Sequence, residues 1–481
     1  MTDEMLASRR FGMSDQIAFA KWSSDWNPMH LDHAFARRTQ VGAPVVHGIH
    51  NLAWAANAVL ERFPLQVANI RARFLQPLYL DETARIWIRE RTEQQVEFEV
   101  VAENTVVAHV NLSTQPGKSI GQSPQPAPSG PVRLAQPANL PFEQLAAQSG
   151  AVPTGDDGPG SAFSALTGGI GSAAVKALLA TSQIVGMACP GLHSLFAGLD
   201  INCEAKNQPA GALAYRVSKT DARFRSLQID VAGSGITGRL EAFARLAPPS
   251  QPGMSEISQR MTGRPFAGQR SLIIGGSRGL GEVTAKIVAA GGGLPVITYR
   301  DNPEDAERVS ADILAGRGQC ERLHYDVLAP AAVRLQQLGK FDCAYYFATP
   351  KIFQRKSALF EPEKLRNFLR YYADGFFDLC IALAARGTEK ISMFYPSTVA
   401  IDDAATATTE YAMAKMSGET LVKHINHSMP NIHVITRRLP RILTDQTATV
   451  GVASADNALD VMIPIVYEVQ QKARPASAPR G

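Results

Sequence analysis

The chain has 481 residues, of which 45% are hydrophobic and 19% are charged. This length exceeds what one hydrophobic core can hold, so we expect two to four domains. The net charge of +4 comes without long runs of lysine or arginine, which argues against a nucleic-acid-binding protein. No run of about 18 apolar residues occurs, so no membrane span is expected.

The N-terminus and the cysteines indicate a cytoplasmic protein. The first residues, Met-Thr-Asp-Glu-Met, lack the basic and apolar regions of a signal peptide. The five cysteines are scattered, and their spacing fits neither a zinc site nor a disulfide framework. We therefore expect a reducing compartment and no metal site.

Two segments rich in Pro, Gly, Gln and Ser, 115–139 and 247–264, interrupt the chain. Such a composition cannot bury a core and usually marks a domain boundary. The Ala/Pro/Arg-rich tail from about 472 is expected to be disordered. We therefore predict three domains, with bounds at 1–116, 140–248 and 265–470.

The first domain is expected to combine one helix, near 48–63, with an alternating sheet. Val96, Phe98 and Val100 alternate with polar residues, and the same period recurs at 86–88 and 106–112. This alternation predicts an antiparallel sheet with one buried face. A single helix beside it predicts an α+β fold in which the sheet wraps the helix.

The second domain repeats this plan. A helical stretch near 166–187 precedes alternating segments at 199–203, 213–217 and 227–231. The repeated order suggests an internal duplication, and therefore two related α+β domains in the N-terminal half.

The third domain alternates strands and helices. An apolar strand at 272–274 precedes a glycine loop and a helix at about 282–290, and further strands are expected at 295–299 and 323–325. Buried apolar runs separated by helices predict an α/β fold with a doubly wound parallel sheet.

The glycine loop and a downstream Tyr/Lys pair together indicate a reductase. Gly275, Gly279 and Gly281 lie between the expected strand and helix, where glycines let backbone N–H groups approach a pyrophosphate. Tyr411 and Lys415 are four residues apart and share one helix face. A nearby ammonium lowers the pKa of a phenol, which could then protonate a carbonyl oxygen during hydride transfer. The Tyr/Lys spacing alone is equally typical of a solvated helix.

Residues of about 268–468 resemble the short-chain dehydrogenase/reductase family, through Gly275-Gly-Ser-Arg-Gly-Leu-Gly281 and Tyr411-Ala-Met-Ala-Lys415. The resemblance implies a Rossmann-type sheet, with Tyr411 as the acid/base and Lys415 binding the ribose and tuning Tyr411. The hydroxyl that holds the substrate carbonyl corresponds to Ser397 or Thr398, and we favour Ser397. The other cofactor-binding residues that it implies are Ser277, Leu280, Asp326 beside the adenine, and Thr444 beside the nicotinamide amide.

Two arginines favour NADP(H) over NAD. An acidic residue after the second strand would accept hydrogen bonds from a free 2′-hydroxyl. Here Arg300 stands at that place, and Arg278 lies within the glycine loop. Guanidinium groups suit a 2′-phosphate, which in turn favours the reductive direction.

The reductase segment departs from its family at three places. The usual Asn-Asn-Ala-Gly after the fourth strand is replaced by Tyr346-Phe-Ala-Thr-Pro350, and the Asn of the next helix is replaced by Tyr372. The usual Pro-Gly after the sixth strand is Pro440-Arg441. These changes put the family's proton relay in doubt and keep open an impaired reductase.

Asp25 and His30 indicate a second site, near the N-terminus. A carboxylate and an imidazole converging on one water can both deliver and remove a proton, as hydration next to a thioester requires. Gly48 would open a helix after His47, so its N–H could stabilise an enolate oxygen. The Asp-to-His spacing by itself favours a simpler interpretation, an Asn-Pro turn with a solvated Asp and a metal-free surface His.

Residues of about 8–113 resemble the MaoC-like (R)-specific enoyl-CoA hydratases of the hotdog fold. The residues that carry this resemblance are 19–36, which include Asp25-Trp-Asn-Pro-Met-His30, and Val46-His47-Gly48. The resemblance implies that Asp25 and His30 are the catalytic dyad and that Asn27 supports the site. Ser24 replaces a usual Gly, which we expect to be a mild change. The domain at 140–248 then resembles a second, degenerate hotdog without a dyad.

The combined prediction is a bifunctional enzyme, an NADPH-dependent 3-oxoacyl-thioester reductase and a 3-hydroxyacyl dehydratase/enoyl hydratase. Its partner would be an acyl thioester of CoA or of an acyl carrier protein, and a homodimer is expected. One alternative is the degradative order, hydratase followed by 3-hydroxyacyl dehydrogenase. Another is a scaffold or binding protein with an impaired reductase domain.

Overall fold

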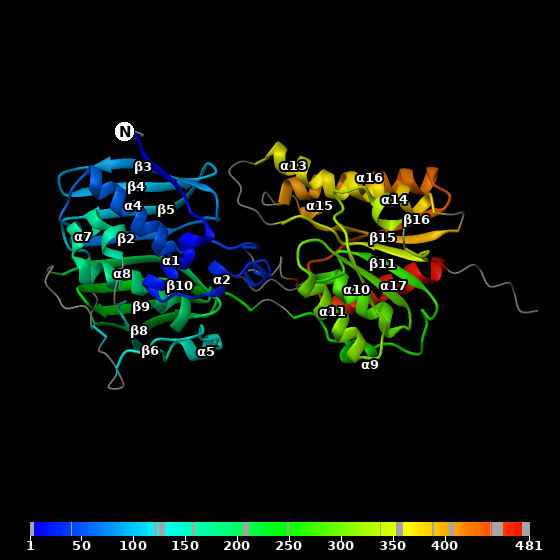
Figure 1. The fold of residues 1–481 in the computed structure, drawn as a ribbon, viewed down its shortest axis with the longest axis horizontal. Coiled ribbons are helices and arrows are strands. Elements are labelled where there is room, and N and C mark those ends of the chain that lie inside the picture. The colour runs from blue at the N-terminus through cyan, green and yellow to red at the C-terminus, as the bar shows by residue number, and fades with distance from the viewer. Residues whose placement is uncertain are drawn as a thin grey trace, which may run out of the picture. The chain divides into compact units, whose positions relative to one another are not determined.

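The structure of the protein is a computed structural model, and its chain divides into two compact units, Met1–Ala247 and a second that starts at Pro248. Each unit has a sheet of its own (Figure 1). The structure describes residues 4–39, 41–119, 123–124, 130–155, 159–204, 211–247, 250–336, 338–352, 359–386, 389–403, 408–442, 444 and 456–473.

The first half of unit 1 contains the predicted long helix and five strands. Its elements are β1 (Glu4–Arg10), α1 (Met13–Ser23), α2 (Pro28–Leu31), α3 (His33–Ala36), α4 (Gly48–Arg62), β2 (Asn69–Phe74), β3 (Thr83–Arg91), β4 (Gln95–Ala102) and β5 (Thr105–Ser113).

The second half of unit 1 again contains one long helical segment and five strands. Its elements are α5 (Phe142–Leu145), β6 (Ser149–Pro153), α6 (Pro159–Ala162), α7 (Ser164–Ile170), α8 (Ser172–Gln183), the π-helical turn η1 (Ile184–Ala188), β7 (Ser194–Cys203), β8 (Ala212–Asp221), β9 (Ser226–Gly233) and β10 (Ile236–Ala244).

The ten strands form one antiparallel sheet in which the two halves have the same strand order. Counted from its outer edge, the first half runs β1-β3-β4-β5-β2, and the second runs β6-β8-β9-β10-β7. The halves meet where β2 pairs with β7, with Ile70 opposite Ile201. The matching order supports the predicted duplication, because two unrelated halves would not be expected to share a five-strand topology.

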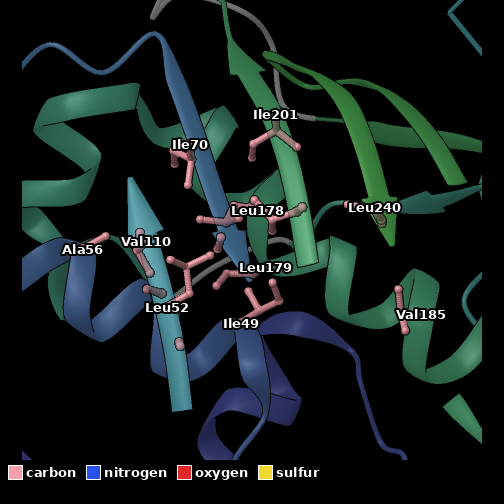
Figure 2. Packing of buried hydrophobic residues seen from close by; sticks show 14 of the residues in the cluster. Ile49, Leu52, Ala56, Ile70, Val110, Leu178, Leu179, Val185, Ile201 and Leu240 are labelled. Atoms are coloured by element: carbon pink, nitrogen blue, oxygen red, sulfur yellow. The ribbon is translucent and has the colours of Figure 1, made fainter. Parts of the chain in front are cut away.

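The long helices α4 and α8 pack on this sheet and on each other. Ile49, Leu52, Leu178 and Leu179 are fully buried in one continuous core that includes both halves. Figure 2 shows side chains of α4 and α8 meeting beside β2 and β7. Neither helix could bury its apolar face without the sheet, so the two halves form one folding unit around a common core.

Unit 2 alternates helices and strands. Its elements are α9 (Met254–Gln259), β11 (Arg270–Ile274), α10 (Gly279–Ala290), β12 (Leu294–Tyr299), α11 (Pro303–Ala315), β13 (Glu321–His324), α12 (Ala331–Leu335), β14 (Cys343–Tyr346), α13 (Pro362–Leu369), the π-helical turn η2 (Arg370–Asp374), α14 (Gly375–Ala384), β15 (Ile391–Thr398), α15 (Ala400–Asp403), α16 (Thr409–Ser428), β16 (Ile432–Leu439) and α17 (Ala458–Ala473).

The six strands of unit 2 form a parallel sheet in the order β13-β12-β11-β14-β15-β16. Helices α14 and α16 cover one face of the sheet, and α10, α11 and α17 cover the other (Figure 1). This is the predicted doubly wound, Rossmann-type fold. The strand order reverses between β11 and β14, and ligands of such sheets bind at the carboxyl ends of the strands at that point.

The predicted linker 247–264 is wrong in its second part. Residues 254–259 form α9, and Met254 and Ile257 are buried in the core between the sheet and α10. Lys286 donates to the carbonyl of Pro252 over 3.0 Å and pairs with Asp312 over 2.7 Å. Two apolar side chains were enough to hold a segment whose composition otherwise indicated a linker.

Among the described residues, no single helix is long and apolar enough to span a membrane, and only the pair Ser164–Ile170 and Ser172–Ala188, bent by 108°, passes the same test together. All five cysteines are free thiols.

Candidate active sites

A short loop between α1 and α2 carries the predicted hydratase residues. Helix α1 ends at Ser24, which has a left-handed backbone with φ 59° and ψ 23°. Asn27 then caps α2 by accepting from the N–H of Met29 over 3.0 Å, and Pro28 occupies the first helical position. A positive φ favours Gly, so Ser24 carries some backbone strain, and the expectation that Ser is a mild change here stays a prediction.

Asp25 is buried, with 2% of its surface exposed, and both carboxylate oxygens accept hydrogen bonds. Oδ1 accepts from the backbone N–H of Asn27 over 3.1 Å, and Oδ2 accepts from the hydroxyl of Ser182 over 2.6 Å. Burial raises the pKa of this carboxyl, while His30 and the two hydrogen bonds act in the opposite direction. A carboxylate with a raised pKa is suited to exchange a proton near neutral pH.

His30 presents one free ring nitrogen to this carboxylate. Its Nδ1 lies 2.7 Å from the carbonyl of Val45, which can only accept, so Nδ1 carries the hydrogen and Nε2 is left as the acceptor. The ring stacks on His47 at a centroid distance of 3.8 Å. Burial is the main cause that lowers the pKa of His30, so the neutral, proton-accepting form is favoured. Three possible ligand atoms, one each from Asp25, His30 and His47, lie within 4.8 Å of one another.

The spacing of these three donor atoms would also be compatible with a metal ion. Two of the three groups are already hydrogen-bonded within the chain: Oδ2 of Asp25 to Ser182, and Nε2 of His47 to the carbonyl of Asp25 over 3.2 Å. Hydrogen bonding therefore accounts for the cluster, and the expectation that the site holds no metal stays a prediction.

Gly48 begins α4 beside the dyad. His47 is the fully buried residue before it, and Gln16 holds that residue in place by accepting from its backbone N–H over 3.1 Å. In the described part of the chain, no group accepts a hydrogen bond from the N–H of Gly48. A Cβ at this position would lie 3.3 Å from the ring of Phe74. The free N–H and the helix dipole behind it are available for an oxyanion.

Asn27 does not point to a substrate. Its side-chain Nδ2 donates to the carbonyls of Gly186 and Gly191 over 2.8 and 3.2 Å, and its Oδ1 caps α2. Only 1% of the residue is exposed. We therefore interpret the expected supporting role of Asn27 as a positioning one, because Nδ2 fastens the active loop to the second half and Oδ1 caps α2.

Two residues of the second half contact Asp25 of the dyad, and neither was predicted from the sequence. Ser182 on α8 donates to Asp25, and Gly186 in η1 lies so close that a Cβ there would overlap with the carboxylate of Asp25. The two positions are four apart, on one helical face. No local motif marks them, and only the predicted duplication could have directed attention to the helix of the second half.

In the second half, whose sequence contains no such dyad, the segment before α8 makes structural contacts with the first half. Asn57 of α4 accepts from the N–H groups of Ala165 and Leu166 at the start of α7, over 3.0 and 3.1 Å. Phe163, which precedes them, is buried against Trp22 and His50. An aromatic side chain and a capped helix therefore occupy this region.

In unit 2, the glycine loop has the backbone that a dinucleotide cradle needs. Gly275 and Gly279 have φ of +75° and +55°, which residues with a Cβ rarely adopt. A Cβ at Gly281 would overlap with the carbonyl of Gly275. Arg278 is the N-cap of α10, and Ser277 before it is buried. These features fit a pyrophosphate at the N-terminus of α10.

The remaining predicted cofactor residues lie around this loop. Leu280, in the first turn of α10, packs against the core, and Thr444 lies about 3.8 Å from where a Cβ of Gly279 would be. Asp326 follows β13, and its Oδ1 accepts from the N–H of Leu328 over 3.0 Å. The loop and the segment after β16 therefore meet at the reversal point of the sheet.

Arg300 follows β12, as predicted, but is already engaged. Its guanidinium pairs with Asp301 at 2.5 Å and donates to the hydroxyl of Tyr371 over 2.6 Å. The hydrogen bond to Asp301 is the main cause that raises the pKa of Arg300. A 2′-phosphate would therefore compete with Asp301 for this side chain.

Thr398, and not the favoured Ser397, faces Tyr411. A hydrogen bond from Thr398 opposes the effect of burial, which raises the pKa of the Tyr411 phenol. Ser397 instead donates to Glu419 over 2.5 Å, and Glu419 is held by Arg438. Both hydroxyls therefore bond to residues of α16, Thr398 to Tyr411 near the start of the helix and Ser397 to Glu419 further along it.

Lys415 lies in an aromatic setting. Its ammonium is 4.0 Å from the ring centre of Tyr372 and donates to the carbonyl of Pro396 over 2.8 Å. Burial lowers the pKa of Lys415 to about 7. The tuning of the Tyr411 phenol by Lys415 stays a prediction. Tyr372, at the place of the family's Asn, bonds to Thr349 through its hydroxyl over 2.5 Å.

Residues 6–111 match the family model described as MaoC like domain. The chain therefore contains a MaoC-like hotdog domain at its N-terminus. It is 52% identical over 42 residues to the (R)-specific enoyl-CoA hydratase of Aeromonas caviae, covering 9% of this chain and 31% of that one. It is 33% identical over 73 residues to the peroxisomal multifunctional enzyme type 2 of Mus musculus, covering 14% and 10%. These segments span a third or less of the relatives' lengths.

Solved structures similar to this chain include short-chain dehydrogenases/reductases. One is a 3-oxoacyl (acyl-carrier-protein) reductase from Agrobacterium tumefaciens C58 with NADP bound, 20% identical, with a TM-score of 0.35, covering 38% of this chain and 75% of that one. Another is a short-chain dehydrogenase from Escherichia coli CFT073 complexed with NADPH, 17% identical, with a TM-score of 0.38, covering 43% and 92%. The parallel sheet and its strand order define the fold of unit 2 by themselves.

Proposed function

We propose that unit 1 adds water to a trans-2-enoyl thioester, or removes it from the (R)-3-hydroxyacyl thioester. Asp25 and Nε2 of His30 would hold one water between them. As the water oxygen bonds to the β-carbon, one member of the pair accepts its proton, and a proton is delivered to the α-carbon at the same site. Dehydration reverses these steps.

The N–H of Gly48 would stabilise the enolate oxygen that develops on the thioester. It is a backbone donor without a partner at the start of a 15-residue helix, so it is already oriented toward developing negative charge. Ser182, Asn27 and Gly186 would fix the orientation of Asp25 and exclude bulk water from it.

The observation that carries the hydratase proposal is the geometry of His30. Its Nδ1 is held by Val45, so only Nε2 can exchange a proton, and the dyad lies within 4.8 Å. Asp25→Asn and His30→Ala should each lower the hydration rate of crotonyl-CoA by about 10²-fold or more, and the double mutant should be little worse. NADPH-dependent reduction, measured on the same samples, should not change. Full hydration activity in His30→Ala would refute the dyad, whereas loss of both activities would indicate unfolding.

We propose that unit 2 binds NADP(H) and reduces a 3-oxoacyl thioester. The glycine loop and the N-terminus of α10 would hold the pyrophosphate, and Arg278 and Arg300 would contact a 2′-phosphate. When bound, the cofactor supplies hydride to the carbonyl carbon. Tyr411 would give a proton to the carbonyl oxygen, and the hydroxyl of Thr398 would hold that oxygen in place.

Cofactor choice can be tested at Arg300. NADPH should bind more tightly than NADH by about 1–3 kcal/mol, and Arg300→Asp should reduce or invert this preference. Asp301→Asn is a matched variant, because it frees the guanidinium of Arg300 and should strengthen NADPH binding further. Equal dissociation constants for both cofactors in the parent would contradict this part of the proposal.

The two chemistries fit one sequence of steps on one substrate. Reduction of a 3-oxoacyl thioester gives a 3-hydroxyacyl thioester, which the hotdog unit could dehydrate to the enoyl product. The acyl carrier could be CoA or an acyl carrier protein. The degradative order, hydration followed by oxidation, is the alternative, and the arginines expected at the 2′-phosphate favour the biosynthetic one.

A second candidate function is a scaffold with an impaired reductase domain. It is favoured by Tyr372 at the place of the family's Asn and by the pairing of Arg300 with Asp301. NADPH oxidation with acetoacetyl-CoA separates the two. Turnover that falls by about 10²–10⁴-fold in Tyr411→Phe, with unchanged NADPH binding, would support the reductase. An inert parent that still binds NADPH would support the scaffold.

We further propose three domains with a hotdog pair at 1–116 and 140–248, and a homodimer formed through unit 2. Apolar side chains are exposed in neighbouring turns of α14 and α16, at Phe377, Ile381, Met413 and Met416, with exposed fractions of 42% to 50%. Such a stripe is typical of a surface that pairs with a second copy. The free thiols support a reducing, cytoplasmic location.

A further inference from the structure

A second polar cluster lies beside the hydratase loop, and the proposed chemistry does not use it. It consists of His193, just before β7, and Arg245, just after β10. The backbone N–H of Arg245 donates to the carbonyl of His193 over 2.8 Å, and its Nε donates to the carbonyl of Ser194 over 3.3 Å. Leu192, which precedes His193, accepts from the side chain of Asn27 over 3.4 Å. The cluster is therefore adjacent to the loop that carries the dyad.

Both residues of this cluster have buried polar atoms without a partner. Only 5% of Arg245 is exposed, and its Nη2 is buried with no hydrogen bond. Nδ1 of His193 is buried and unpartnered in the same way. Within the described residues, no carboxylate pairs with Arg245. A buried guanidinium without a counter-ion is costly, and two unsatisfied groups on contacting residues indicate a missing ligand.

The charges around the cluster favour an anion. Burial lowers the pKa of Arg245 only to about 10, so the guanidinium still carries its charge at neutral pH. This charge is close enough to lower the pKa of His30 and, together with Arg225, that of His193. Burial is the main cause at His193 and brings its pKa to about 4, so the imidazole is neutral and can also donate or accept. The cluster of Arg245 and His193 therefore carries a net positive charge.

We propose that Arg245 and His193 form an anion subsite of the hydratase, which binds an anionic oxygen group carried by the thioester substrate. The proposal rests on the hydratase function of unit 1. A phosphate or a carboxylate would satisfy the guanidinium through paired hydrogen bonds. The group could be a phosphate of the CoA or carrier arm, or a carboxylate on the acyl chain, and the same geometry would recognise either.

The two sources can be separated with three substrates. Crotonyl-pantetheine has no anionic group, crotonyl-CoA adds the phosphates, and glutaconyl-pantetheine adds only an acyl carboxylate. Arg245→Gln should raise KM about 10-fold or more for the substrate with the recognised anion and leave crotonyl-pantetheine unchanged, with kcat altered by less than about twofold. Arg223→Gln is the control, because Arg223 is exposed and its guanidinium pairs with Asp221 and not with this cluster.

Equal effects on all three substrates, or no effect on any, would overturn the proposal. Thermal unfolding of Arg245→Met gives an independent readout. Because Arg245 has no counter-ion, a binding role predicts an unchanged or higher unfolding temperature, whereas a purely structural role predicts a lower one. If the parent hydrates no thioester, the proposed hydratase function fails by itself. The subsite is then tested by calorimetric titration with coenzyme A and with sodium glutarate. Binding that is lost in Arg245→Gln supports the subsite, and absent or unchanged binding overturns it.

Discussion

The hydroxyl of Ser182 donates a 2.6 Å hydrogen bond to Oδ2 of Asp25, although the two residues are 157 positions apart and belong to different halves of unit 1. Gly186, one turn further along the same helical segment, leaves the space that this carboxylate fills. The half without a dyad is therefore needed by the half that has one. This dependence gives a physical reason for the second half to accompany the first.

Ser182→Ala should lower the hydration rate by about 10-fold, because Asp25 loses a charge-assisted hydrogen bond in a buried site. Loss of that bond should also shift the acid limb of the pH–rate profile to higher pH, since the bond favours the ionised carboxylate. Thr181→Ala is the control, because the hydroxyl of Thr181 bonds only to the carbonyl of Leu178. An unchanged pH profile in Ser182→Ala would show that the contact does not act on the dyad.

Ser24→Gly should stabilise the protein by about 1 kcal/mol, because Gly adopts the left-handed backbone at φ 59° without strain. Ser23→Gly should destabilise it, since the hydroxyl of Ser23 bonds to Phe19 and to the N–H of Asp25. The unfolding midpoint in urea measures both changes. A less stable Ser24→Gly would mean that the hydroxyl of Ser24 contributes more than the strain costs.

Thr398→Ala should lower the rate of carbonyl reduction by about 10²-fold, because Tyr411 and the substrate oxygen lose their shared hydroxyl partner. Ser397→Ala should change the rate by less than about threefold, since its hydroxyl bonds to Glu419, further along α16, and not to Tyr411. NADPH consumption with acetoacetyl-CoA gives both rates. The opposite ranking would restore Ser397 as the substrate-binding hydroxyl.

Lys415→Met should remove a pH dependence from the stability of unit 2. The folded pKa of Lys415 is about 7, against 10.5 for the exposed side chain, so the unfolded chain binds more protons between these values. Below pH 7 both states are protonated and the full cost of burying the charge applies, up to about 5 kcal/mol. The stability of the parent should therefore rise from pH 7 to pH 10, relative to Lys415→Met. Parallel stability curves for the two proteins would contradict the lowered pKa.

The fragment 250–481 should be more stable than 265–481 by about 3–5 kcal/mol, because Met254 and Ile257 are buried and Lys286 bonds to the segment before them. The fragment 1–247 should also fold, since it contains the whole ten-stranded sheet. In contrast, 1–113 alone should aggregate, because β2 would lose its partner β7 and expose a sheet edge. Urea unfolding and size-exclusion chromatography test these statements. Equal stability of the two C-terminal fragments would show that α9 is dispensable.

The sequence alone determined those features whose physical cause is local. The positive φ values at Gly275 and Gly279, the four-residue spacing of Tyr411 and Lys415, and the alternating strands all follow from backbone sterics or helix and strand periodicity. The loop of Asp25 and His30 is also local, because a capped turn brings the two side chains together. These features were sufficient to predict both folds and the principal candidate residues.

The tertiary structure decided those features of the sites that depend on contacts between distant segments of the chain. Ser397 and Thr398 are neighbours at the end of β15, and only the position of α16 decides which of them meets Tyr411. Asn27 donates to the second half, and Arg300 pairs with Asp301. Neither contact could be predicted from the spacing of residues in the sequence. Ser182 and Arg245 lie in segments without a motif, and they reach the hydratase loop only because two five-stranded halves share one sheet and one core.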